Sequence, residues 1–117
     1  MKMNRIEQRM QIELVKYMRA CLCPGVEFLH VPNEGKRSKA GNGILKAMGM
    51  LPGASDLIGF VPPAARFWAL ELKQPGEEPT EDQYKFLAAV NAAGGFSDWA
   101  DDIAEAIITL RRWRVIR

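Results

Sequence analysis

The sequence contains few of the residues on which disulfide-bonded and histidine-based metal proteins rely. Its 117 residues include one histidine, His30, which excludes a site built from several histidines. Cys21 and Cys23 are separated by one residue, a spacing that disfavours a mutual disulfide and offers zinc no second ligand pair. We therefore expect both thiols to be reduced and structural, and we interpret His30 as a structural residue.

Long apolar runs are also missing. No run approaches the roughly 20 residues that span a bilayer, and residues 1–5 lead into a charged stretch rather than the apolar part of a signal peptide. We expect a cytoplasmic protein. The composition, 48% hydrophobic and 26% charged, is typical of a globular chain, and the length allows one core but not two. We expect a single domain over residues 1–117.

A strong excess of one charge is absent too, because the net charge is only +2. Cations nevertheless cluster in two places, and clusters of this kind contact phosphates. One cluster comprises Lys36, Arg37, Lys39 and Lys46, and the other comprises Arg111, Arg112, Arg114 and Arg117. The helix dipole already favours cations at a helix C-terminus, which suffices to explain the second cluster. For the first, phosphate contact and a solvated loop both remain open.

Hydrophobic periodicity and turn residues predict eight elements in the order helix, strand, short helix, strand, strand, helix, strand, helix. The predicted ranges are 5–22, 26–31, 44–48, 56–61, 67–73, 81–92, 96–99 and 102–113. Thr80 is the expected N-cap of the third helix. These elements predict an α/β fold with a small mixed sheet flanked by helices.

Three charged residues are placed for metal chemistry. Strand alternation puts Glu71 and Lys73 on one face of the apolar run 67–73. Asp56 follows the glycine-bearing turn 51–55, and the interval between Asp56 and Glu71 suits a hairpin that sets the two carboxylates opposite each other. Carboxylate oxygens are the ligands that Mg²⁺ and Mn²⁺ prefer. The alternative is a solvated strand face, with Asp56 capping a turn.

A glutamate on the first helix is a further candidate. Glu7 falls within a predicted apolar stripe, and a buried carboxylate is costly unless it is paired or bound to metal. The members of that stripe are Met10, Leu14, Tyr17, Met18 and Cys21. The alternative is an exposed Glu7 in the first helical turn, favoured by the dipole. Glu13 is the fallback ligand, although it lies on a less suitable face.

A glutamine follows the predicted hairpin. Gln83 is in the first turn of the third helix, which can return over the pocket of Glu71 and Lys73. One interpretation is a contact with phosphate or water at the helix N-terminus. The other is a capping interaction with Thr80.

The ordered set of these residues resembles the VRR-NUC family, the virus-type replication and repair nucleases of the PD-(D/E)xK superfamily. The resemblance covers roughly residues 7–107. It is carried by Glu7, Gln11, Asn33, Gly35, Lys46, Gly49, Pro52, Gly53, Asp56, Glu71, Lys73, Gln83, Gly94 and Gly95. The family turn commonly reads Gly-Val-Pro-Asp, whereas this chain has Ala54 and Ser55 before Asp56 and keeps the acid.

The resemblance implies a restriction-endonuclease-like core and a metal-dependent, structure-selective DNA endonuclease. It would hydrolyse phosphodiester bonds, in particular those of branched DNA such as four-way (Holliday) junctions. Asp56 and Glu71 would hold Mg²⁺ or Mn²⁺, helped by the backbone carbonyl of Leu72 and by Glu7. Lys73 would orient or deprotonate the attacking water, and Gln83 would position Lys73 or the phosphate.

The resemblance also implies partners for the chain. DNA would be held without sequence preference through backbone contacts from Asn33, Lys36, Arg37, Lys39 and Lys46. A homodimer would suit the two-fold symmetry of a junction, and the protein would work in a bacterial cell as a phage or prophage product. Two alternatives are a nuclease-fold module that binds branched DNA without cutting it and a small protein-interaction domain.

Overall fold

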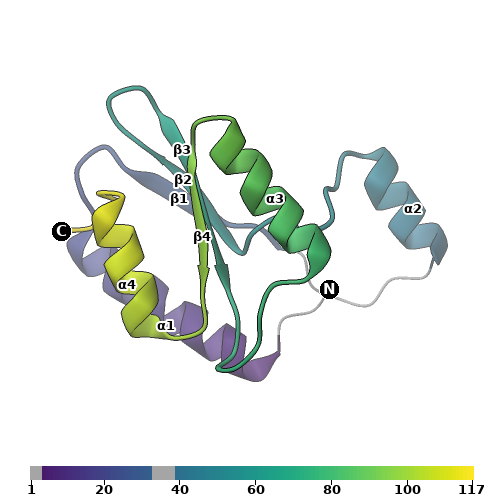
Figure 1. Ribbon diagram of the computed structural model, residues 1–117, viewed down its shortest axis with the longest axis horizontal. Helices are drawn as coiled ribbons and strands as arrows, with labels where there is room; N and C mark the ends of the chain where they lie inside the picture. Colours follow the sequence, from purple (N-terminus) through teal and green to yellow (C-terminus); the bar gives the residue numbers. More distant parts are fainter. Residues whose placement is uncertain (1–3, 33–38) are drawn as a thin grey trace.

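A mixed four-stranded sheet in the order β1-β2-β3-β4 forms the centre of the structure (Figure 1). The computed structural model describes residues 4–32 and 39–117, of which residues 39–42 are described by their backbone alone. The strands are β1 (Glu27–His30), β2 (Leu57–Val61), β3 (Arg66–Leu72) and β4 (Phe96–Ala100). The first three pair antiparallel, and β4 runs parallel to β3.

Four helices complete this described part of the chain: α1 (Arg5–Cys21), α2 (Lys39–Ala47), α3 (Glu81–Ala92) and α4 (Ile103–Arg112). The element order confirms the predicted α/β fold, a mixed sheet flanked by helices. The predicted ends of α3 match those observed, because Thr80 caps one end and Gly94 follows the other. None of the described helices combines the length and apolar character needed to cross a membrane.

The main core lies on one face of the sheet, between the sheet and the helices α1 and α4. Alternation along β3 sends Trp68, Leu70 and Leu72 to this face, where all three side chains are fully buried. Leu14 from α1 and Leu110 from α4 join the same cluster. Helix α3 covers part of the opposite face (Figure 1). Glu71 alternates with these buried residues and faces that side, where its carboxylate accepts a hydrogen bond from Gln83 of α3.

Two predictions about the helices are wrong. Helix α2 begins at Lys39 rather than residue 44, since the chain tolerates Gly41 and Gly43 in a helix at a cost of about 1 kcal/mol each. The apolar stripe of the first helix predicts a buried Tyr17, but this side chain is 39% exposed. Its hydroxyl accepts a hydrogen bond from Arg111 Nη2 at 2.7 Å, so the ring lies at the edge of the core with its polar end outward.

The turn before β2 packs directly against the start of α3. Gly53 has a φ of +86°, and a β-carbon at this position would collide with the carbonyl of Asp82 and lie 2.8 Å from Gln83 N. Two effects disfavour any side chain at this position: the positive φ strains residues other than glycine, and the start of α3 leaves no room for a β-carbon. The turn therefore sets the position of Asp56 relative to the first turn of α3.

We predict that Gly53→Ala destabilises the protein more than Gly76→Ala. Gly76 has the same φ of +86°, but a β-carbon added there would have nothing within 4 Å, so its substitution carries the conformational cost alone, roughly 1–2 kcal/mol. Gly53→Ala adds overpacking against α3, which costs roughly another 1–3 kcal/mol. Urea unfolding of both variants measures the difference, and equal losses would contradict this account of the turn.

Candidate active site

Asp56 and Glu71 lie opposite each other at one end of the sheet. Leu57 pairs with Leu70 in the antiparallel register of β2 and β3, which brings Asp56, just before β2, opposite Glu71. Asp56 Oδ2 accepts a hydrogen bond from the backbone N–H of Leu72 at 2.9 Å. Glu71 is only 3% exposed and Asp56 is half-buried, so at least one of the two carboxyl groups has little access to solvent.

The two carboxyl groups resist ionisation. Burial raises the pKa of Glu71 to about 9, and the neighbouring charge of Asp56 adds to the effect. Burial also raises the pKa of Asp56, although the hydrogen bond from Leu72 N opposes this shift. Asp56 therefore disfavours the charge on Glu71, whereas a proton shared from Glu71 lowers the pKa of Asp56, so the pair favours a protonated Glu71 beside an ionised Asp56.

Gln83 connects Glu71 to Lys73. Its Nε2 donates to Glu71 Oε2 at 3.0 Å, and its Oε1 accepts from Lys73 Nζ at 3.3 Å. The same Oε1 accepts from Thr80 N, while Thr80 Oγ1 accepts from Gln83 N. The predicted capping interaction with Thr80 is confirmed, and the same side chain also contacts Glu71 and Lys73. The contact of Gln83 with phosphate or water stays a prediction.

Glu7 reaches the same end of the sheet from α1. The side chain of Asn4 caps α1 by accepting from Glu7 N, and Glu7 Oε2 accepts from the backbone N–H of Gln74 at 3.1 Å. Its charge raises the pKa of both Asp56 and Glu71, which places it near the pair. Glu13 is exposed and lines a different hollow with Arg9, so the geometry favours Glu7 as the third carboxylate.

The donor atoms suit a hard divalent cation. Glu71 Oε1 is buried and has no hydrogen-bond partner in the described part of the chain, and it adjoins a second carboxyl group. Either a shared proton or a cation would relieve this arrangement, and oxygen donors are those that Mg²⁺ and Mn²⁺ prefer. Among the described residues, no three Asp, Glu, His or Cys side chains are close enough to form a ligand set. The residues present therefore fit a site with two direct carboxylates.

Two residues at the site are not predicted from the sequence. The carbonyl of Asp56 accepts from His30 Nδ1 at 3.0 Å, which requires that nitrogen to carry the proton. Ser55, next to Asp56, is fully buried, and its hydroxyl lacks a partner among the described residues. The sequence holds no local signal for the His30 contact, because it depends on the register of β1 against β2.

The predicted DNA contacts are described only in part. Asn33, Lys36 and Arg37 lie outside the described residues, and Lys39 is described by its backbone alone. Lys46 is exposed on α2, which projects away from the sheet (Figure 1).

The arginines of the C-terminal cluster make contacts within the chain. Arg111 donates to the carbonyl of Arg117 at 3.2 Å as well as to Tyr17, and Arg112 lies 3.7 Å from a carboxylate oxygen of Asp98. These contacts within the chain support a structural role for Arg111 and Arg112 rather than a role in binding phosphate.

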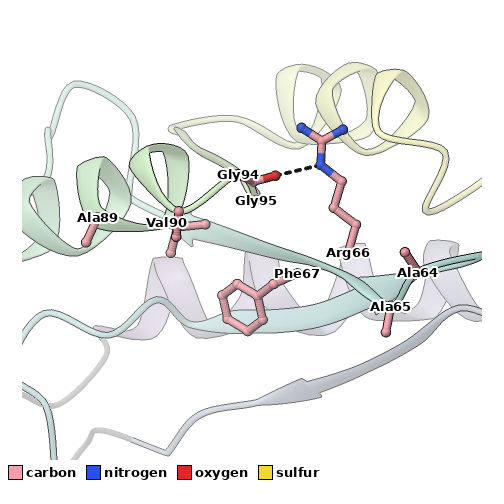
Figure 2. Close-up of a pocket in the computed structure, with 9 residues that line it drawn as sticks. Ala64, Ala65, Arg66, Phe67, Ala89, Val90, Gly94 and Gly95 are labelled. Atoms are coloured by element: carbon pink, nitrogen blue, oxygen red, sulfur yellow. Dashed lines mark hydrogen bonds between the residues drawn. The ribbon is translucent and has the colours of Figure 1, made fainter.

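A hollow of about 560 Å³ lies at the opposite end of β3 from Glu71. Figure 2 shows that Phe67, Val90 and the backbone of Gly94 line it, and that Arg66 crosses one side to donate to the carbonyl of Gly94 at 2.8 Å. The Arg66 guanidinium also lies over the ring of Phe96, 3.7 Å from its centre. None of the candidate catalytic residues lines this hollow, so its size alone does not identify the site.

Comparison with known proteins identifies the fold. A scan against protein-family models finds no match, and a search of curated proteins finds none either. Among solved structures, a chain described as a VRR_NUC domain protein matches with a TM-score of 0.75, covering 95% of this chain and 89% of its own length at 18% sequence identity. A match at this identity speaks for the fold alone. The chain therefore has the α/β fold of a VRR_NUC domain protein.

Proposed function

We propose that the protein is a Mg²⁺- or Mn²⁺-dependent deoxyribonuclease that cuts phosphodiester bonds within DNA. The observation that carries this proposal is the pairing of the half-buried Asp56 with the buried Glu71, with one Glu71 oxygen lacking a partner among the described residues and Lys73 held beside it through Gln83. Strongly perturbed carboxyl groups in a desolvated site are characteristic of catalytic centres. The VRR_NUC-like fold adds independent support.

Asp56 and Glu71 would hold the metal directly. The N–H of Leu72 points toward Asp56, and in a strand the carbonyl of the same residue points to the same side, so this carbonyl would be available to a metal held by Asp56. Glu7 would contribute through water, since its carboxylate is committed to Gln74 N. A bound divalent cation would polarise the scissile phosphate and lower the pKa of a bound water.

Lys73 and Gln83 would act on the phosphate and the water. The Lys73 ammonium would offset negative charge that builds on the phosphate and would orient the water. Accepting a proton from that water would require the neutral amine form of Lys73. Gln83 keeps Lys73 in place, because its amide oxygen accepts from Nζ while its amide nitrogen is held by Glu71. If the amide were flipped, its nitrogen would face the Lys73 ammonium and its oxygen would face Glu71, so only the observed orientation lets Gln83 bridge the ammonium and the ionised carboxylate.

The proposed substrate is branched DNA such as a four-way junction, bound by a homodimer through backbone contacts. Lys46 and the neighbouring cations of that segment would supply phosphate contacts without sequence preference. Two active sites in a two-fold dimer match the two-fold symmetry of a junction. Support for self-association comes from exposed apolar side chains in and after α2, namely Ile44, Met48 and Leu51.

We predict that Glu71→Gln lowers the rate of cleavage of junction DNA in Mg²⁺ or Mn²⁺ by on the order of a hundredfold or more, because a metal ligand is lost. The amide keeps the size of the side chain, so folding is preserved. Glu77→Gln, an exposed residue of the loop that follows, is the matched control and should cleave like wild type. Gel assays on junction, flap and single-stranded DNA measure the rates. If wild type leaves all three intact, the enzyme proposal fails; if Glu71→Gln still cuts at the wild-type rate, the site is wrong.

We predict that, as pH rises, the folding stability of the metal-free protein falls while the extra stability conferred by Mn²⁺ grows. In metal-free protein the folded pKa of Glu71, about 9, exceeds its ordinary value of 4.5, so the folded state binds the extra proton and stability falls as pH rises between these values. A bound metal requires the carboxylate form, so the stabilisation by Mn²⁺ should grow over the same range.

Thermal unfolding across that pH range, with EDTA or with Mn²⁺, measures both trends. Glu71→Gln should flatten the metal-free profile and remove most of the gain from Mn²⁺, whereas Glu77→Gln should retain both. A metal-free stability that rises toward pH 9 would contradict the buried, protonated state of Glu71.

We predict that Met48→Lys weakens self-association, because it puts a charge on an apolar side chain that is 78% exposed. Sedimentation at micromolar concentration should give a dimer for wild type and a monomer for the variant. Lys85→Met, a change at an exposed position on α3, is the control and should leave the dimer intact. A wild-type monomer would contradict the homodimer.

A further inference from the structure

A groove of about 450 Å³ lies between α1 and the edge strand β1, on the face of the sheet that carries the core. We call it the α1–β1 groove. Its lining includes Gln11, Val15, Lys16 and Arg19 from α1 and Phe28 and His30 from β1. Its volume is in the range of sites that take small organic ligands, roughly 300–1,000 Å³.

The groove combines an apolar floor with a cationic rim. Phe28 and Val15 are half-buried against the core and supply the floor, while Lys16 and Arg19 are exposed at the rim. No acidic side chain is among the described residues that line it. This chemistry fits a ligand with a flat, weakly polar part and a negative charge, and a nucleotide has both.

Gln11 adds a polar group that the fold does not use. Its Oε1 is buried and has no hydrogen-bond partner in the described part of the chain. Leaving a buried amide oxygen without a donor is unfavourable, so a partner from outside the chain would stabilise it. The edge of a nucleobase carries both donors and acceptors, which suits a side-chain amide.

The groove approaches the candidate active site at two points, although the side chain of Glu71 lies on the opposite face of the sheet. Gln11 lies one helical turn after Glu7 on α1. His30, which lines the groove, contacts the carbonyl of Asp56 through Nδ1. A DNA strand whose scissile phosphate lies at Asp56 and Glu71 would therefore have an adjacent nucleotide within reach of the groove.

We propose that the α1–β1 groove holds one unpaired nucleotide next to the scissile phosphate. The base packs against Phe28 with its edge at Gln11, and Lys16 and Arg19 contact its phosphates. A base reaches such a groove only when it is unpaired, as at a branch point, a mismatch or a flap. The inference rests on the proposed nuclease function and narrows its substrate to DNA with at least one unpaired nucleotide at the cut.

Binding can be tested apart from cleavage. Thymidine 5′-monophosphate is titrated into ¹⁵N-labelled protein in EDTA, with inorganic phosphate as the comparison. The expected result is saturable shifts of the Gln11, Phe28 and His30 amides with the nucleotide and weaker shifts with phosphate. Absence of shifts at these residues, or equal shifts with both compounds, would overturn the proposal.

A pair of double variants separates a specific site from general attraction. Lys16→Glu with Arg19→Glu removes the rim, and Arg5→Glu with Arg9→Glu makes the same change of charge elsewhere on α1. All four side chains are exposed, so both proteins should fold. We expect the first to weaken nucleotide binding about tenfold and the second to weaken it little. Equal losses would overturn the proposal.

A cleavage assay then tests the position of the nucleotide. A junction with one abasic residue flanking the cut should be cleaved about tenfold more slowly than the intact junction, because the stacked base is missing. Equal rates would overturn the proposal. Nucleotide binding in EDTA by a protein that cuts no DNA would overturn the nuclease function and leave the groove supported.

Discussion

The burial of the Glu71 carboxyl group is the constraint on which the rest of the site depends. A desolvated carboxylate is unfavourable unless something compensates it, and here only one of its oxygens has a partner in the described part of the chain. Replacing a buried ionisable group by an apolar side chain of similar volume is often neutral or stabilising, so the acid is difficult to explain by folding alone. The neighbouring Asp56 makes the arrangement more costly still. A cation bound between the two would remove both costs, which is why the proposed chemistry and the electrostatics agree.

Gln83 transmits this constraint to the helix that follows. Its amide is held by Glu71, Lys73 and the backbone of Thr80, so the first turn of α3 and the end of β3 form one hydrogen-bonded unit. The capping box that starts the helix is therefore also the support of the site. The turn before Asp56 packs against the same first turn of α3, because Gly53 leaves room for the backbone of Asp82 and Gln83. The hydrogen bonds that start α3 therefore also position the side chains of the site.

The parts of the structure that the sequence predicts are those encoded by local patterns. The hairpin of β2 and β3, the two ends of α3 and the role of Thr80 depend on neighbours within a few residues, so spacing and turn residues suffice. The contacts of Glu7 with Gln74 and of His30 with Asp56 join residues far apart in the chain, and no local pattern encodes them. The prediction for Tyr17 is wrong for the same reason, since its exposure is set by the position of α4.

Helix α1 links the proposed chemistry to the proposed recognition of the substrate. Its capped first turn fixes Glu7 against the loop after β3, close enough to raise the pKa of both site carboxyl groups but committed to a backbone N–H. Glu7 thus adds negative potential to the site without completing a direct three-carboxylate ligand set among the described residues. The next turn of the same face carries Gln11, at the head of the α1–β1 groove. Because one rigid helix spaces the two residues, the fold would fix the distance between the proposed scissile phosphate and the proposed base site. The groove would then select strands that can present a base at that distance.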